Sequence, residues 1–337
     1  MRLTQFFFYS LLLFFLSCNK ENRKPQWEKI TVFEKSDNLK GFSTQKIITD
    51  SDRIFLLLHS SFYEYYNNLY YSPDNGKTWK KTAIGGGSFN DTMIDDICLS
   101  SSGSVFSIYS SDLSGGKIIK FNPESETTSN IPFTSYDNEL MNKCSFPSDS
   151  IGYIGMSEPF SFISWIIKTS NGGFDWDTLY WGNDEIKAVQ FINEDRGWFI
   201  TSTHFIVTLD GGNNWDTLFS NNNNSFNYFE MANDNLGAIA GDKVWGTTDG
   251  GFNWNPILEK SVTSLSVNEN GSVYVLDQDH NVSKSTNFGI SWSKPCDFNQ
   301  YFTFVKSKGN STVAGVSLSI KNDGDKLKED VYILKEK

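Results

Sequence analysis

Short apolar runs alternate with turn-forming residues along most of the chain. The recurring unit is an apolar run, a turn that usually contains glycine, and a second apolar run. Runs of this kind, bounded by such turns, predict β-strands. The unit occurs seven times, more loosely in the first and last copies, in residues 42–58, 95–110, 141–156, 186–201, 226–241, 262–277 and 302–317. The chain is therefore expected to be a series of strand pairs.

An eight-residue segment follows five of these strand pairs. A hydroxyl residue is followed by Asp or Asn two positions later, by Gly two after that, and by Trp three further on. The copies are Ser72, Asp74, Gly76, Trp79; Thr169, Asn171, Gly173, Trp176; Thr208, Asp210, Gly212, Trp215; Thr247, Asp249, Gly251, Trp254; and Ser285, Asn287, Gly289, Trp292. The last four tryptophans are 39, 39 and 38 residues apart. A fixed period of this size indicates one supersecondary unit per repeat.

The residue types in this segment predict a tight turn between two strands. Asp, Asn, Ser and Thr side chains bond the backbone two residues on, and glycine supplies a positive-φ position at no steric cost. The tryptophan opens the next strand and offers a large apolar face with one N–H donor. The segment resembles the Asp-box (BNR) repeat. That resemblance implies a β-propeller in which the box joins the third and fourth strands of a blade and has a structural role.

Two further segments complete the expected ring. Residues 117–122 and 127–133 read as the outer strands of a blade whose box has decayed to residues 123–127. At the end of the chain only a third strand, residues 330–334, remains, whereas residues 27–31 read like the strands that follow each box. The prediction is an all-β, seven-bladed β-propeller of four-stranded antiparallel blades. Its ring would be closed by the N-terminal strand pairing into the last blade, within a single domain of residues 26–337.

The first 25 residues are expected to be a signal peptide followed by a tether. Residues 1–18 have one basic residue and then an apolar run too short to span a bilayer, as in a signal peptide. Their end, FLSC, resembles a bacterial lipobox, which implies acylation at Cys18; an ordinary signal peptide is the alternative. Residues 19–25 are a polar tether. The expectation is a lipid-anchored protein of a bacterial cell envelope, at the outer membrane, facing the periplasm or the surface.

The net charge and the cysteines limit the ligands and bonds that the chain is expected to form. The net charge is −11, and an acidic protein of this kind is not expected to bind nucleic acid. The only expected membrane attachment is the acylated Cys18. The protein is expected to be a monomer. Cys98 and Cys144 occupy matching positions in successive repeats, so a disulfide bond between them is one alternative. Two buried free thiols are the favoured alternative. With Cys296 the remaining cysteines are odd in number and lack the spacing of a metal site.

The sequence contains no recognisable set of catalytic residues. Sialidases, which carry Asp boxes, need three arginines on the substrate carboxylate, and outside the signal and tether (Arg2, Arg23) only Arg53 and Arg196 remain. A sialidase is therefore excluded. Glycoside hydrolases need only two carboxylates, and the loop pairs Asp184/Glu185 and Asp277/Asp279 are not distinguished from solvated charges. The histidines, His59, His204 and His280, fall in different repeats. No catalytic residue, metal or cofactor is assigned.

Aromatic loops are the better candidate site. In a propeller the loops between second and third strands and between blades converge on one face. The candidate binding residues there are Tyr63, Glu64, Tyr65, Tyr66, Phe160, Phe162, Trp181, Asp184 and Glu185. Exposed aromatic side chains anchor peptides or stack on sugars; the alternative is that they plug the channel mouth or pack on neighbouring blades.

A second resemblance concerns function. The fuller repeat, EDRGWFIT followed by TLDGGNNW, resembles the photosystem II assembly/stability factor type of propeller over most of residues 27–337. This implies a non-enzymatic protein that holds a partner, although the arginine-rich face of that group is absent. The sequence thus predicts a lipid-anchored propeller that binds a protein or exported polymer through its aromatic loops. The alternative is a glycan-binding protein or a glycoside hydrolase that acts on extracellular polysaccharide.

Overall fold

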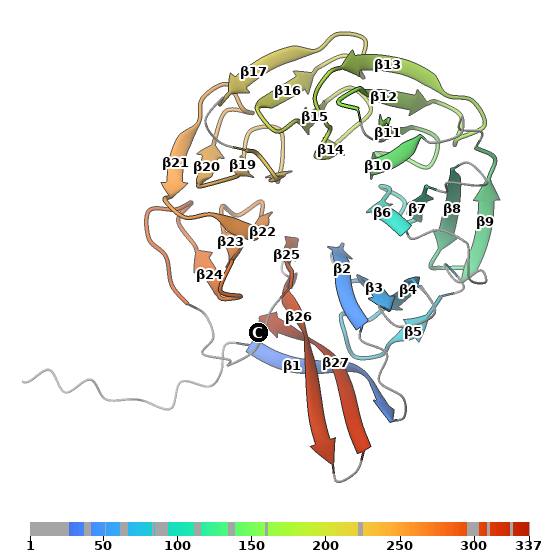
Figure 1. The fold of residues 1–337 in the computed structure, drawn as a ribbon, viewed down its shortest axis with the longest axis vertical. Helices are drawn as coiled ribbons and strands as arrows, with labels where there is room; N and C mark the ends of the chain where they lie inside the picture. Colours follow the sequence, from blue (N-terminus) through green and yellow to red (C-terminus); the bar gives the residue numbers. More distant parts are fainter. Residues whose placement is uncertain are drawn as a thin grey trace, which may run out of the picture.

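The computed structural model describes residues 27–336 except 37–41, 51, 61–66, 83, 85–93, 111–115, 134–138, 159–160, 222–224, 295–302, 309–310 and 324–325. The described residues form antiparallel β-sheets arranged around a central axis (Figure 1). No helix in these residues is long and apolar enough to cross a membrane. The all-β propeller predicted from the sequence is confirmed.

Five blades of four strands follow one another along the chain. Blade 1 is β2 (Phe42–Thr49), β3 (Ile54–Ser60), β4 (Asn67–Ser72) and β5 (Lys80–Lys81). Blade 2 is β6 (Ile94–Leu99), β7 (Val105–Tyr109), β8 (Lys117–Asn122) and β9 (Thr127–Ile131). Blade 3 is β10 (Leu140–Ser145), β11 (Gly152–Ser157), β12 (Ser164–Thr169) and β13 (Asp177–Gly182). Blade 4 is β14 (Ala188–Phe191), β15 (Gly197–Ile200), β16 (His204–Thr208) and β17 (Asp216–Ser220). Blade 5 is β18 (Tyr228–Met231), β19 (Gly237–Ala240), β20 (Val244–Thr247) and β21 (Asn255–Leu258).

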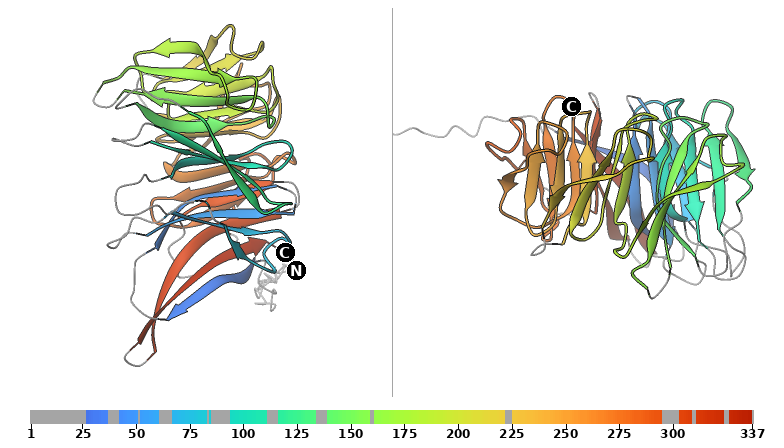
Figure 2. Two further views of the ribbon diagram at one scale, coloured as in Figure 1. Left: turned by 90° about the vertical axis from the view of Figure 1, so that its right-hand side faces the viewer. Right: turned by 90° about the horizontal axis from the view of Figure 1, so that it is seen from above.

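Two sheets complete the ring. A three-stranded sheet contains β22 (Val262–Val267), β23 (Val273–Asp277) and β24 (Val282–Ser285). The closing blade has the order β1 (Trp27–Ser36), β27 (Lys326–Glu336), β26 (Ser311–Asp323) and β25 (Val305–Lys308). Its strands β26 and β27 are long and project past the ring (Figure 2).

The predicted count of seven four-stranded blades is wrong. The described residues form six four-stranded blades, and the sheet β22–β24 has only three strands. After the Trp292 turn its ladder continues only as an isolated bridge, in which Lys284 and Ser293 exchange two backbone hydrogen bonds of 2.8 Å. Two residues later the sequence has Pro295, which has no backbone N–H to donate to a ladder. Within the described ranges, this turn is therefore not followed by the outer strand that the turn pattern predicts.

The N-terminal strand closes the ring as predicted. It pairs antiparallel with β27 from Trp27 opposite Glu336 to Ser36 opposite Lys328, and so is longer than the sequence pattern indicated. Ile30 in this strand lies against Gly76 of blade 1. Other turns show the same contact between a glycine and the outer strand of the preceding blade: Gly173 lies against Ile131, Gly212 against Leu179 and Gly289 against Ile257. Strand β1 therefore occupies the position of an outer blade strand.

The eight-residue turns share one hydrogen-bond pattern. In the turn of blade 5, Thr247 Oγ1 accepts the Gly251 N–H at 2.9 Å and donates to Asp249 Oδ1 at 2.9 Å. The same carboxylate accepts the backbone N–H of Asn253 at 2.9 Å. The equivalent hydroxyl bonds to glycine occur at Ser72, Thr169, Thr208 and Ser285. A buried hydroxyl thus satisfies a buried backbone donor in every copy.

Four of the five tryptophans in these turns donate their indole N–H in one of two ways, and the Trp215 N–H has no partner among the described residues. Trp79, Trp176 and Trp254 donate to the carbonyl oxygen of the glycine three residues earlier in the same turn, at 3.2, 3.0 and 2.8 Å. Trp292 instead donates to Ile257 O in the outer strand of the preceding blade, at 2.9 Å. The indole rings therefore lie between neighbouring sheets, where the apolar core sits.

Replacing Thr247 by valine should destabilise the fold. The change keeps the side-chain shape but leaves the buried Gly251 N–H without its acceptor, which costs about 1–3 kcal/mol of unfolding free energy. Chemical denaturation of the purified chain measures this loss. Thr248→Val is the matched control, because Thr248 is exposed in the same turn; equal losses in the two variants would contradict the assigned role of the hydroxyl.

Candidate functional site

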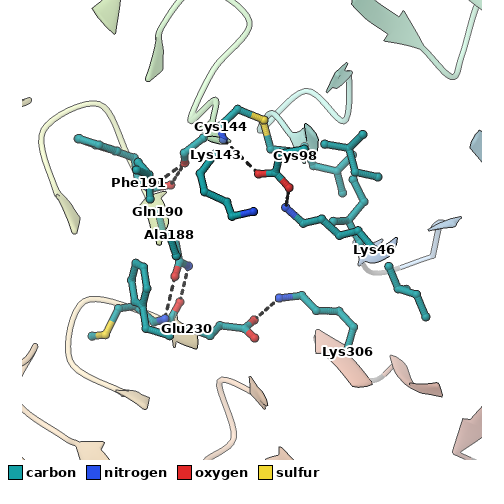
Figure 3. Close-up of a pocket in the computed structure, with 18 of the residues that line it drawn as sticks. Lys46, Cys98, Lys143, Cys144, Ala188, Gln190, Phe191, Glu230 and Lys306 are labelled. Carbon is teal, nitrogen blue, oxygen red and sulfur yellow. Dashed lines mark hydrogen bonds and ion pairs between the residues drawn. The ribbon is translucent and has the colours of Figure 1, made fainter. Parts of the chain in front are cut away.

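The innermost strands enclose a cavity of about 990 Å³ along the propeller axis. Its walls come from β2, β6, β10, β14, β18, β22 and β25 (Figures 1 and 3). Most innermost strands carry charged or polar side chains within otherwise apolar runs. The cavity is therefore a polar channel rather than an apolar pocket, and its chemistry depends on how those side chains are paired.

Side chains join the innermost strands to one another. Gln190 Nε2 donates to Met231 O at 2.7 Å, and its Oε1 accepts the Met231 N–H at 2.8 Å. Ser145 Oγ accepts the Phe191 N–H at 2.8 Å, and Ser266 Oγ accepts the Ser307 N–H at 2.8 Å. These edge strands thus have part of their backbone satisfied by the neighbouring blade, which stiffens the channel wall.

Two ion pairs cross between blades in the channel. Lys306 Nζ lies 2.6 Å from Glu230 Oε1, and Lys46 pairs with Asp96. The second oxygen of Asp96 accepts the Cys144 N–H at 3.1 Å. Burial lowers the pKa of Lys46, but the Asp96 carboxylate and the Cys144 and Cys98 thiols together raise that pKa above its usual value. Lys46 therefore stays charged inside the wall.

Asp95 is the channel carboxyl with the most altered acidity. The Ser110 backbone N–H donates to its carboxylate. Its side chain still meets solvent, yet the surrounding protein desolvates the carboxylate and raises the pKa of Asp95 from 3.8 to about 6. The Lys143 ammonium acts in the opposite direction. Lys143 extends into the channel (Figure 3), and its side-chain ammonium has no hydrogen bond or ion pair within the described part of the chain.

The second candidate region is one end of the outer strands of blade 3. Trp165 and Trp181 are directly opposite across β12 and β13, with ring centroids 5.1 Å apart at 27°. Trp165 is 7% exposed, whereas Trp181 is 65% exposed. Phe162 and Ile163, which directly precede β12, are 76% and 40% exposed. We call Phe162, Ile163 and Trp181 the blade-3 aromatic patch.

The two predicted acidic residues beside this patch are already engaged. The Asp184 carboxylate accepts Ser202 Oγ at 2.8 Å and Thr203 Oγ1 at 3.3 Å. It therefore ties the crossing from blade 3 to the second turn of blade 4. Glu185 is exposed and pairs with Lys187 at 2.5 Å. Neither carboxylate is free to act alone.

Only part of the predicted loop face can be placed. Phe162 lies just before β12 and Trp181 lies near the end of β13, so both are at the same end of blade 3. Tyr63, Glu64, Tyr65, Tyr66, Phe160 and the lipidation residue Cys18 lie outside the described residues. Ile163 was not among the predicted site residues, and neither were the charged channel residues Lys46, Asp95, Asp96, Lys143, Glu230 and Lys306. The available signal was a charged residue inside an apolar innermost strand, as in the Asp95-Asp96 pair of β6.

The other acidic pair and the histidines do not form a reaction centre in the described residues. Asp277 is buried, lies 2.5 Å from Lys260 Nζ and accepts the Asn281 N–H at 2.9 Å, so it holds a turn. His204 Nδ1 lies 2.8 Å from Thr203 Oγ1. Within the described ranges no three His, Cys, Asp or Glu side chains are close enough to hold a metal.

Known proteins resemble the chain in structure but not in sequence. No protein-family model and no curated protein matches it. A structure of YCF48 bound to a D1 peptide aligns with a TM-score of 0.66 at 12% identity, covering 94% of this chain and 98% of YCF48. The WD40 propeller of Doa1 aligns with a TM-score of 0.59 at 10% identity, covering 92% and 97%. The chain has the β-propeller fold.

A third neighbour shows that this fold also accompanies catalysis. A prolyl endopeptidase structure aligns with a TM-score of 0.57 at 10% identity, covering 87% of this chain and 50% of the endopeptidase. At such identities the likeness establishes the architecture alone. The β-propeller part of the resemblance inferred from the sequence is therefore supported, and function has to be argued from the residues of this chain.

The raised pKa of Asp95 predicts a specific pH dependence. Between about pH 4 and pH 6 the folded chain binds more protons at Asp95 than the unfolded chain, so this residue lowers the unfolding free energy as pH rises through that interval. Asp95→Asn removes the ionisation and should stabilise the protein more at about pH 7.5 than at about pH 4. Denaturation at both pH values measures the difference.

Asp149→Asn is the control with the opposite sign. Burial would raise the pKa of Asp149, but hydrogen bonds from Lys120, Ser100 and Ser102 outweigh it and hold that pKa at about 2. This carboxylate therefore stabilises the fold at neutral pH, and the stabilisation is lost only as pH falls toward 2. An Asp95→Asn effect that stays constant with pH would contradict the assignment.

Proposed function

We propose that this chain is a non-enzymatic propeller that binds an extended segment of a protein partner on the face that carries the blade-3 aromatic patch. The observation that carries the proposal is the exposure of Phe162, Ile163 and Trp181 at one end of paired strands. Single exposed apolar residues are ordinary, but adjacent aromatic ones on a rigid support are typical of interaction anchors. The predicted residues Tyr63, Tyr65 and Tyr66 would extend the same face.

The support under the patch favours recognition without large rearrangement. Trp181 stacks on Trp165 of the neighbouring strand β12, and Trp165 is itself buried. The crossing that follows Trp181 is held by Asp184 on Ser202. Less side-chain and loop entropy is then lost when a ligand binds.

The comparisons support this reading by analogy. YCF48, whose fold is similar, is described bound to a D1 peptide. Asp184 of the pair Asp184/Glu185 and Asp277 of the pair Asp277/Asp279 are engaged in structural hydrogen bonds, which argues against either pair as a hydrolytic site. The proposal includes acylation at Cys18, attachment to the bacterial outer membrane and a scaffold or assembly role.

Peptide binding should depend on the blade-3 patch. A displayed library of random extended peptides is selected on the mature chain, and the recovered peptides are measured by fluorescence anisotropy. Phe162→Ala combined with Trp181→Ala should weaken binding by at least about tenfold, because truncating aromatic anchors costs more than 1 kcal/mol each. The variant should keep the unfolding midpoint of the unchanged chain, since both side chains are exposed.

Phe174→Ala combined with Phe252→Ala is the matched control. Both residues are exposed, but they lie in the eight-residue turns at the opposite end of the blades. Equal loss in both double variants, or unchanged affinity in the patch variant, would contradict this face assignment.

A sugar-binding role is the second candidate, favoured by the flat Trp165–Trp181 stack with one exposed indole. Indole faces bind sugars as readily as peptides. Purified protein is tested on a panel of extracellular polysaccharides by gel-shift electrophoresis and by release of reducing ends. Retardation that Trp181→Ala abolishes, with no peptide recovered from the library, would replace the peptide proposal. Released reducing ends would indicate a glycoside hydrolase.

Membrane attachment should depend on Cys18. Cells that express the full chain are labelled with a radioactive fatty acid and then fractionated. The unchanged chain is expected to carry label and to sediment with the outer membrane, whereas Cys18→Ser should lose both properties. Cys296→Ser is the control. Label retained in Cys18→Ser would contradict the lipobox assignment.

A further inference from the structure

Two thiols from neighbouring blades meet at the wall of the channel. Cys98 belongs to β6 of blade 2 and Cys144 to β10 of blade 3. Their sulfur atoms lie 2.7 Å apart and face each other (Figure 3), and both are free thiols in this structure. A disulfide bond is about 2.05 Å long. The two sulfurs therefore need only a small adjustment to bond.

The surroundings hold this pair in place. The backbone N–H of Cys144 donates to Asp96, whose other oxygen pairs with Lys46 of blade 1. On the following residue, Ser145 Oγ is joined to the Phe191 backbone of blade 4. The strand that carries Cys144 is thus fixed from both sides, so the sulfur contact follows from the closure of the ring rather than from a mobile loop.

The two thiols differ in access. Cys144 is 4% exposed, whereas Cys98 is half-buried, and both line the channel of about 990 Å³. Burial raises the pKa of the Cys144 thiol, as does its contact with Cys98, while the Lys46 ammonium acts in the opposite direction. Cys98 is therefore the thiol that an oxidant in the channel meets first.

We propose that Cys98 and Cys144 are a redox-active dithiol that forms an intramolecular disulfide bond between blades 2 and 3. The oxidant is a small disulfide such as glutathione disulfide, which enters through the channel. This assignment does not depend on the ligand proposed above.

The reaction is a two-step thiol–disulfide exchange. The Cys98 thiolate attacks one sulfur of the oxidant, forms a mixed disulfide and expels one thiolate. Cys144 then gives up its proton to the departing second thiolate, attacks Cys98 Sγ and completes the Cys98–Cys144 bond. The protein loses two protons and two electrons, and the oxidant disulfide becomes two thiols.

The bond would cross-link innermost strands that are 46 residues apart in the chain. A cross-link that closes a loop of this length restricts the unfolded chain, so oxidation should raise the Tm by about 5 °C. Both sulfurs already lie in contact, so little strain is expected in the folded state.

The test uses the purified full chain in its reduced form. It is equilibrated with glutathione buffers of rising disulfide content, and free thiols are then blocked with an alkylating reagent. Intact mass and peptide mapping follow. The unchanged chain and Cys296→Ser should each lose two hydrogen atoms and yield one cross-linked peptide that contains Cys98 and Cys144. Cys98→Ser and Cys144→Ser should yield no such peptide and should show no change of Tm on oxidation.

Two results would overturn the proposal. One is complete alkylation of both cysteines in the unchanged chain at the most oxidising ratio. The other is a cross-link from Cys98 or Cys144 to Cys296 instead. If a serine variant fails to fold, the mapping of the unchanged chain decides alone, because the cross-linked peptide identifies both residues.

Discussion

The geometry of the ring depends on one short hydrogen-bonded turn. In each copy a buried hydroxyl accepts the N–H of the glycine four residues later, and that glycine lies against an apolar side chain of the preceding sheet, such as Phe205 of blade 4 at Gly251. Gly173, with a φ of 98°, could not hold a Cβ without displacing Ile131. The turn therefore shapes one blade and also sets the spacing to its neighbour, so the same residues return at a fixed period.

This double role explains which parts of the fold are predictable from the sequence. A local turn and the strand on each side leave a visible pattern, and the Trp27 strand can be matched to the strands after Trp79 and Trp254. A strand ladder also needs backbone donors after the turn, and Pro295, two residues past Ser293, has no backbone N–H. The Trp292 turn is complete in its side-chain bonds, yet only Ser293 pairs with Lys284 beyond it. The fourth strand was predicted from the turn and is absent from the described sheet.

The candidate site shows the same division. Phe162 and Trp181 could be proposed as exposed aromatic residues, although Trp181 lies in strand β13 and not in the loop predicted for it. The role of Asp184 could not, since Ser202 and Thr203 of the next blade take up its carboxylate. The channel pairs Lys46–Asp96 and Glu230–Lys306 join residues 50 and 76 positions apart, and only the closed ring brings them together.

The channel and the aromatic patch have different physical characters, and this bears on how a ligand would bind. Two ion pairs between blades, Lys46–Asp96 and Glu230–Lys306, engage charges on the channel wall, so a ligand that used these charges would have to displace existing bonds at a high cost in desolvated charge. The blade-3 patch presents apolar area that is still in contact with water, on strands already ordered by Trp165. Covering that area releases water without breaking a protein hydrogen bond. A partner is therefore expected to bind the patch on the face, while the channel wall keeps the blades in register.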